Sequence, residues 1–291
     1  MSDKLTVGCV QLTSTTDIAE NIKISSDLIR EAHGQGAQLI GLPEVVNLVQ
    51  RSRKKSAEVV RTEDQETSLK AYRALAAELG IWLHTGSLVI KLLDDERNVN
   101  RSFLIDDKGT IAATYDKIHM FDVDLENGVS FRESKGFRPG DRAVVAETPW
   151  CGIGMTVCYD VRFAYLYRAL AKAGASILMV PAAFTRQTGG AHWQILLQAR
   201  AIETGCFVVA PAQCGDHEDG RETYGHSLII APWGEIIADG GEEPGVITAE
   251  LDFALVDKAR GMVPALSHDR DFAPAVPIGL RQAGEQRLIT V

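Results

Sequence analysis

The stretch GMTVCYDVRF, residues 154–163, changes from apolar to polar at Cys158. The apolar run 151–157 predicts a buried strand, and residues 163–172 predict a helix. A thiol at such a strand-to-helix turn lies at the carboxyl edge of a sheet, close to backbone N–H groups. An attacking nucleophile needs this position, as in other strand–nucleophile–helix elbows.

Two more polar residues follow apolar stretches in the same way. Glu44 follows QLIGLP, residues 38–43, and Lys117 lies in TYDKIH, residues 114–119. A free thiol is mostly protonated near neutral pH, so it needs a base or a cation beside it. We expect Glu44 to take the thiol proton, and Lys117 with the N–H of Tyr159 to stabilise the oxyanion. Together these residues predict metal-free amide hydrolysis through a thioester on Cys158.

Short β-rich runs alternate with helical patterns along most of the chain. This alternation predicts an α/β protein with mixed strand directions, in one domain over residues 1–291. Residues from about 275 onward are weakly patterned and are interpreted as a C-terminal arm that packs on a partner subunit. The expected strands are 4–10, 38–42, 82–90, 99–105, 111–115, 151–157, 176–181, 206–210, 227–231 and 235–238, and the expected helices are 17–32, 64–79, 163–173 and 191–204.

Composition restricts the class of protein. The 291 residues are 45% hydrophobic, and the formal net charge of −9 argues against a nucleic-acid partner. No apolar stretch approaches the roughly 20 residues that span a bilayer, so no membrane partner is expected. Five cysteines without paired metal spacing favour a reducing, cytoplasmic location, and we expect no metal site and no other cofactor. The single basic cluster, RSRKK at 51–55, is interpreted as a solvated face, with an anionic contact at a pocket rim as the alternative.

Three motifs resemble the signatures of the nitrilase (carbon–nitrogen hydrolase) superfamily, in order and at similar separation. They are LPE at 42–44, YDKIH at 115–119 and VCYDVRF at 157–163, and the resemblance covers about residues 5–272. It implies a four-layer α-β-β-α sandwich with two mixed sheets, assembled as a homodimer or a higher homo-oligomer. Glu44, Lys117 and Cys158 match the family's triad, and Glu133 matches a second glutamate that lies against the lysine and the substrate.

The Cys-Tyr-Asp sequence at 158–160 differs from the Cys-Trp-Glu of nitrile-cleaving members. It resembles the branch that holds omega-amidase and deaminated-glutathione amidase, and the segments around 183–204, 212–215 and 224–227 are closer to the latter. This resemblance implies hydrolysis of the α-keto analogue of glutathione to 2-oxoglutarate and cysteinylglycine. The alternatives are an omega-amidase acting on 2-oxoglutaramate, a carbamoyl-amine hydrolase, and a silent metabolite-binding scaffold. One departure is Tyr165, where many relatives carry Glu.

An anionic keto-acid amide needs cationic or N–H partners. Arg162, four residues after the nucleophile, and Arg186, expected on a loop after strand 176–181, are the candidate cations. A structural ion pair with a nearby carboxylate is an equal alternative for Arg162. Tyr159, Phe184 and Thr185 complete the expected substrate-binding set.

Overall fold

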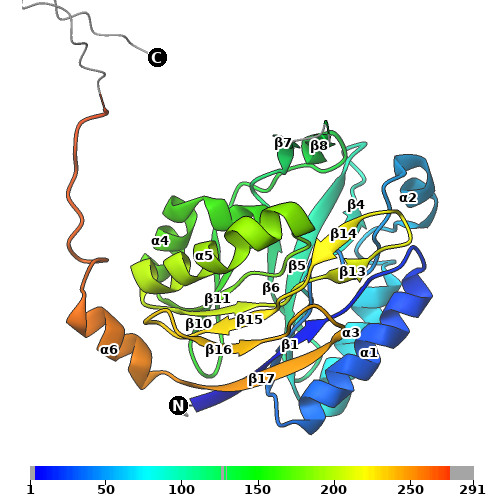
Figure 1. Ribbon diagram of the computed structural model, residues 1–291. Coiled ribbons are helices and arrows are strands. Elements are labelled where there is room, and N and C mark those ends of the chain that lie inside the picture. Colours follow the sequence, from blue (N-terminus) through cyan, green and yellow to red (C-terminus); the bar gives the residue numbers. More distant parts are fainter. Residues whose placement is uncertain (1–3, 126–127, 129, 276–291) are drawn as a thin grey trace, which may run out of the picture.

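The computed structural model describes residues 4–125, 128 and 130–275 (Figure 1). Its first sheet has seven strands in the order β17-β1-β2-β3-β5-β4, with β6 beside β5. Strands β1, β2 and β3 are parallel, whereas the other pairings are antiparallel. The bounds are β1 (Lys4–Gln11), β2 (Leu39–Gly41), β3 (Trp82–His84), β4 (Leu88–Lys91), β5 (Asn98–Ile105), β6 (Ile111–Asp116) and β17 (Gly245–Asp252).

The second sheet has six strands in the order β16-β15-β12-β11-β10-β9. Its central strands β10, β11 and β12 are parallel, and antiparallel strands flank them. Two small hairpins, β7–β8 and β13–β14, stand apart from both sheets. The bounds are β7 (Asp122–Asp124), β8 (Ser130–Arg132), β9 (Val144–Glu147), β10 (Gly152–Met155), β11 (Ala175–Met179), β12 (Phe207–Ala210), β13 (Cys214–Asp216), β14 (Glu222–Tyr224), β15 (Leu228–Ile230) and β16 (Ile236–Asp239).

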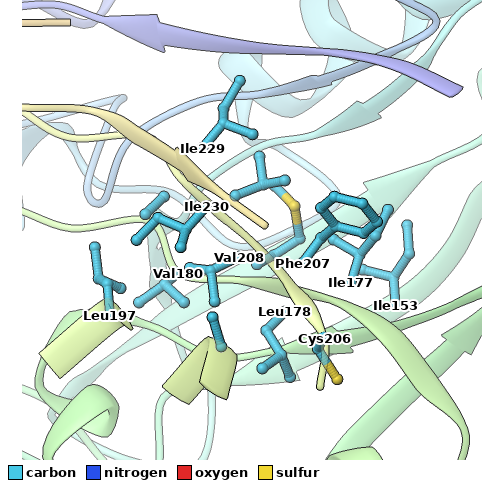
Figure 2. Close-up of a cluster of buried hydrophobic side chains, with 14 of the residues drawn as sticks. Ile153, Ile177, Leu178, Val180, Leu197, Cys206, Phe207, Val208, Ile229 and Ile230 are labelled. Carbon is cyan, nitrogen blue, oxygen red and sulfur yellow. The ribbon is translucent and has the colours of Figure 1, made fainter. Parts of the chain in front are cut away.

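Helices cover the outer faces of the two sheets. Helices α1 (Ile18–Gly34) and α3 (Thr67–Leu79) pack on the first sheet, and α4 (Ala164–Lys172) and α5 (Arg186–Thr204) pack on the second (Figure 1). A buried cluster joins side chains of both sheets, and Figure 2 shows its part around Ile153, Ile177 and Phe207. The four-layer α-β-β-α fold with two mixed sheets is therefore confirmed. Two short helices, α2 (Arg53–Val59) and α6 (Ala254–Met262), complete the set of α-helices in the part of the chain with described structure.

Local sequence explains where the long helices begin and end. The side chain of Thr185 caps α5 by accepting from Thr188 N, and the carboxylate of Asp17 caps α1. Gly80 and Gly205, with φ of 64° and 60°, end α3 and α5 in the left-handed conformation that glycine adopts without steric cost. These ends fix the angle at which each following strand enters its sheet.

The structure corrects three expectations from the sequence. The expected strand 82–90 is two strands, β3 and β4, because the chain bends at Gly86. The expected helix 191–204 begins at Arg186, five residues earlier, so Arg186 lies on a helix and not on a loop. Strands β7, β8, β9, β13, β14 and β17 and helices α2 and α6 were not predicted, because their patterns are short or carry no strong periodicity.

Two further expectations concern membrane-spanning segments and the C-terminal arm. None of the helices in the part that the structure describes is long and apolar enough to cross a membrane. The expected C-terminal arm, from about 275 to 291, lies outside the described residues except for its first position.

The bend at Gly86 generates a test of the fold. Gly86 has φ of 64°, and a Cβ there would lie 1.9 Å from the carbonyl oxygen of Pro43, just before Glu44. Gly86→Ala should therefore lower the free energy of unfolding by more than about 1 kcal/mol, as measured in urea. Gly34→Ala is the matched control, because a Cβ there meets nothing within 4 Å. Equal stability of the two variants would contradict this account of the bend.

Candidate active site

Three buried side chains meet where strands of the two sheets end. Glu44 lies in the turn after β2, Lys117 directly follows β6, and Cys158 begins a 3₁₀ turn, Cys158–Arg162, after β10. Their exposed fractions are 5%, 2% and 8%. The two sheets pack face to face, so these chain segments, distant in sequence, reach the same region.

The ammonium group of Lys117 lies between two carboxylates. Its Nζ is 2.9 Å from Oε1 of Glu44, and 2.8 and 2.9 Å from the two carboxylate oxygens of Glu133. Glu133 opens the 3₁₀ turn Glu133–Lys135 after β8, and it also accepts from Phe121 N at 2.6 Å. The cation therefore cannot reorient without breaking several charge-assisted hydrogen bonds.

The second oxygen of Glu44 and a neighbouring amide complete this network. Oε2 of Glu44 accepts from the backbone N–H of Ala183 at 2.9 Å. Asn100 on β5 donates its Nδ2 to Glu44 at 2.9 Å and to Glu133 at 3.5 Å, and its buried Oδ1 has no partner in the described structure. The sequence analysis did not predict a role for Asn100. The one available signal was that a polar residue interrupts the apolar pattern of a predicted strand.

The backbone at the nucleophile is strained. Cys158 has φ of 51°, a left-handed conformation that is uncommon for a residue with a side chain. Its N–H donates to Pro181 O at 2.8 Å, which ties the turn to the end of β11. Among the hydrogen bonds of the described residues, the N–H of Tyr159 has no acceptor. That N–H is therefore free to donate to a substrate oxygen.

Asp160 joins the lysine motif to the cysteine motif. This fully buried carboxylate accepts from Val157 N at 2.9 Å and from Tyr115 OH at 2.7 Å. Its other oxygen accepts from His119 N at 3.0 Å and lies 2.7 Å from His119 Nδ1. Tyr115 and His119 flank Lys117 in the chain, so Asp160 fixes the ammonium group relative to the thiol. The sequence analysis did not predict this positioning role of Asp160.

The protonation states follow from these contacts. Burial would raise the pKa of Glu44, but Lys117 and hydrogen bonds from Cys158 and Asn100 outweigh burial and lower it below its ordinary value. Burial would lower the pKa of Lys117, but Glu133 and Glu44 raise it well above its ordinary value. The resting site therefore holds an ammonium group and an ionised Glu44.

The thiol itself is neutral at rest. Burial raises the pKa of Cys158 well above its ordinary value, and the Glu44 carboxylate adds to this shift, although Lys117 opposes it. A neutral thiol hydrogen-bonded to an ionised carboxylate is ready to lose its proton to that carboxylate as it attacks. The site is thus suited to general-base activation rather than to a preformed thiolate.

Aromatic and cationic side chains surround the thiol. The Tyr159 ring lies edge to face with Phe121 and Phe163, with centroids 5.2 and 5.4 Å away. The guanidinium of Arg162 lies 5.7 Å from the Tyr159 ring and 5.5 Å from the Phe184 ring. No carboxylate in the described structure pairs with Arg162; its nearest polar partner is His192 Nδ1 at 3.3 Å. Within the described residues Arg162 therefore makes no structural ion pair, and its contact with a substrate stays a prediction.

The other expected substrate residues are placed differently. Arg186 pairs with Asp216 at 2.7 Å and with Glu222 at 3.3 Å, which fastens α5 to the β13–β14 hairpin. The Thr185 hydroxyl serves as the cap of α5. Tyr165, where many relatives carry Glu, places its hydroxyl 2.5 Å from His119 Nε2 and is 66% exposed.

The described residues contain no second cluster of this kind. The described residues contain no group of three or more His, Cys, Asp or Glu side chains able to hold a metal ion. Two cavities, of about 510 and 400 Å³, lie away from the triad, beside α6 and beside Val60. Neither of these two cavities is lined by a cysteine, whereas the triad brings a thiol, a carboxylate and an ammonium group together.

Comparisons with known proteins show the family of this chain. A carbon-nitrogen hydrolase family model matches residues 6–261. A Homo sapiens protein named deaminated glutathione amidase is 40% identical over 270 residues, which are 91% of this chain and 82% of that protein. The crystal structure of the C. elegans NitFhit protein matches with a TM-score of 0.85 and 35% identity, over 92% of this chain and 65% of that longer chain.

A mutant amidase from Nesterenkonia sp. AN1 also matches, with a TM-score of 0.75 and 26% identity over 89% of this chain and 98% of that one. In that structure acrylamide has added to the active-site cysteine. The family expected from the three sequence motifs is therefore confirmed. This chain belongs to the carbon–nitrogen hydrolase family of the nitrilase superfamily.

Proposed function

We propose that this protein is a thiol-dependent amidase that hydrolyses small keto-acid amides, with deaminated glutathione as its substrate. Cys158 is the nucleophile, Glu44 the general base and acid, and Lys117 the oxyanion partner. The observation that carries the proposal is the buried ammonium of Lys117, held by Glu44 and Glu133 beside a neutral thiol. A scaffold that only bound a metabolite would have no need for these buried charges.

The reaction balances without a cofactor. Glu44 takes the thiol proton while Sγ of Cys158 bonds to the amide carbon, and the oxyanion receives hydrogen bonds from Lys117 Nζ and Tyr159 N–H. Glu44 then gives its proton to the leaving nitrogen, the C–N bond breaks, and a thioester remains. Water attacks the thioester carbon while Glu44 accepts a water proton, and that proton returns to Sγ as the acid leaves.

Glu133 acts through Lys117. Its two oxygens both accept from Nζ, so it holds the ammonium group at the point where the oxyanion forms. With two carboxylates around one ammonium, the site carries net negative charge before the substrate binds. An anionic substrate therefore needs an additional cation, and Arg162, which has no carboxylate partner among the described residues, meets that need.

Support for the substrate comes from the human relative named deaminated glutathione amidase. The main rival is 2-oxoglutaramate, which shares the 2-oxoglutaryl group but releases ammonia. Specificity constants for both compounds, measured side by side, decide between them, and a higher kcat/KM for 2-oxoglutaramate would overturn the choice. Release of amine from carbamoyl compounds tests the carbamoyl-amine alternative.

We further propose a homodimer or higher homo-oligomer in the cytoplasm. The described surface beside α5 and α6 exposes Ile202, Trp233, Met262 and Val263, which favours burial against another copy. All five cysteines are free, which fits a reducing compartment. Sedimentation velocity measures the oligomeric state, and fractionation of cells measures the location.

Removing the nucleophile should abolish turnover. Cys158→Ala is expected to fold normally and to lose at least about 10³-fold in kcat, because no other group forms the thioester. Cys151→Ala is the matched control and should keep its activity, since Cys151 lies outside the site. The parent protein should show a 2-oxoglutaryl adduct by intact mass after a substrate pulse, and Cys158→Ala should not. Substantial turnover by Cys158→Ala would refute the mechanism.

The shifted pKa values of Glu44 and Cys158 predict how activity depends on pH. The lowered pKa of Glu44 keeps this carboxylate ionised at pH values below its ordinary pKa, and the raised pKa of Cys158 keeps the thiol neutral far into alkaline pH. Activity should therefore be level between about pH 5.5 and 8.5 and fall only as acid protonates Glu44. Alkylation of Cys158 by acrylamide should likewise show no step in this range. A tenfold rise in either rate near neutral pH would indicate a thiolate or a histidine base instead.

The two arginines provide a matched pair. Arg162→Gln should raise KM for the keto-acid amide about tenfold or more, because it removes the cation proposed to meet the carboxylate of the acyl group. Arg186→Gln should leave KM within about twofold and mainly loosen the β13–β14 hairpin, since its partners are Asp216 and Glu222. Steady-state kinetics measure both effects. A larger KM increase for Arg186→Gln would reverse the assignment.

A further inference from the structure

A concentrated positive charge lies beside the site on a protein of net charge −9. Arg51, Arg53, Lys54 and Lys55, here called the basic segment, are all exposed at the start of α2. None of them has an ion-pair partner within the described ranges, not even Glu58 on the same helix. Four such neighbouring cations repel one another, so an anion would bind there favourably.

Apolar contacts hold the chain on both sides of the basic segment. The chain after Glu44 forms a small apolar cluster, Val45, Leu48, Val49 and Val60 with Val89, and Phe137 packs against it. Phe137 follows Glu133 by four residues. The chain on both sides of α2 is therefore fixed next to the carboxylate half of the site.

One contact places Arg53 at the turn that carries Glu133. A Cβ built on Gly136 would lie 3.8 Å from Nε of Arg53. Gly136 N donates to Glu133 O at 2.9 Å, so this glycine closes the same turn. Lys135, also exposed and without an ion pair in the described structure, belongs to that turn too. The cationic surface thus continues from α2 to the rim beside Glu133.

The proposed reaction determines which part of the substrate lies near the basic segment. The acyl group becomes bonded to Cys158, and Arg162, in the same turn as Cys158, is positioned for the acyl carboxylate. The leaving nitrogen must face Glu44, which protonates it. The rest of the leaving amine therefore extends toward the carboxylate half of the site, where the basic segment lies. A dipeptide spans up to about 7 Å when extended, enough to carry its carboxylate outward to a rim.

We propose that the basic segment binds the carboxylate of the leaving amine. The site then favours amides that release a peptide-like, anionic amine over amides that release ammonia. This inference rests on the proposed amidase function and extends it to the leaving-group side. Because each exposed cation contributes at most roughly fivefold and salt screens it, the selectivity arises from several residues together.

The test compares three substrates that share one acyl group. They are deaminated glutathione, the same compound with its terminal carboxylate converted to an amide, and 2-oxoglutaramate. The test variant is the triple substitution Arg53→Gln, Lys54→Gln, Lys55→Gln. The matched control is Lys23→Gln, Lys70→Gln, Lys108→Gln, which removes the same charge from exposed lysines on α1, on α3 and in the β5–β6 turn.

The test variant should lose about tenfold in kcat/KM for deaminated glutathione and less than about twofold for the other two substrates. Salt should weaken the parent's preference for deaminated glutathione over its terminal amide and have little effect on that preference in the test variant. The control variant should behave like the parent.

Two results would overturn the inference while leaving the amidase function intact. One is an equal loss for all three substrates, and the other is no loss for deaminated glutathione in a test variant with a native thermal transition. If the parent protein hydrolyses none of the three substrates, the proposed function fails and the inference fails with it. A test variant that unfolds is replaced by the single substitution Arg53→Gln, which should retain a selective loss of about threefold.

Discussion

The site depends on one buried ammonium group held by two carboxylates. Lys117 is 2% exposed, and a charge in that position is tolerated only because Glu44 and Glu133 both contact it within 2.9 Å. Removing either carboxylate would leave the remaining charges poorly compensated, which for buried pairs is strongly destabilising. The same arrangement keeps Glu44 ionised as a base and the adjacent thiol neutral. Stability and chemistry are therefore coupled in the same three side chains.

Asp160 connects the segment that carries Lys117, after the first sheet, to the segment that carries Cys158, after the second. It accepts hydrogen bonds from Tyr115 and His119, on either side of Lys117, and from Val157, just before Cys158. Four hydrogen-bond partners fix the direction of this buried carboxylate. Asp160, Tyr115 and His119 thus hold Lys117 and Cys158 in place relative to each other. The strained φ of Cys158 is held by the same turn and by its hydrogen bond to Pro181.

The cations around the site lie in different surroundings. Arg186 is neutralised by the β13–β14 hairpin and contributes to the fold, whereas Arg162 lies among aromatic rings and pairs with no carboxylate of the described residues. Arg53 of the basic segment lies beside the turn of Glu133. Under the proposed function, this separation assigns one cationic group to the acyl part of the substrate and another to the leaving amine.

The sequence by itself determined the alternation of strands and helices, the elbow at Cys158 and the family, because these depend on local periodicity and on contiguous motifs. It could not determine the break at Gly86, which depends on the approach of Pro43 from the segment after β2, or the early start of α5 at Arg186. Nor could it separate the roles of Arg162 and Arg186, since both are arginines after apolar runs. Only the tertiary structure brought Asn100 to Glu44 and Asp160 to Tyr115 and His119, because hydrogen bonds between residues 41 to 56 positions apart leave no periodic signal.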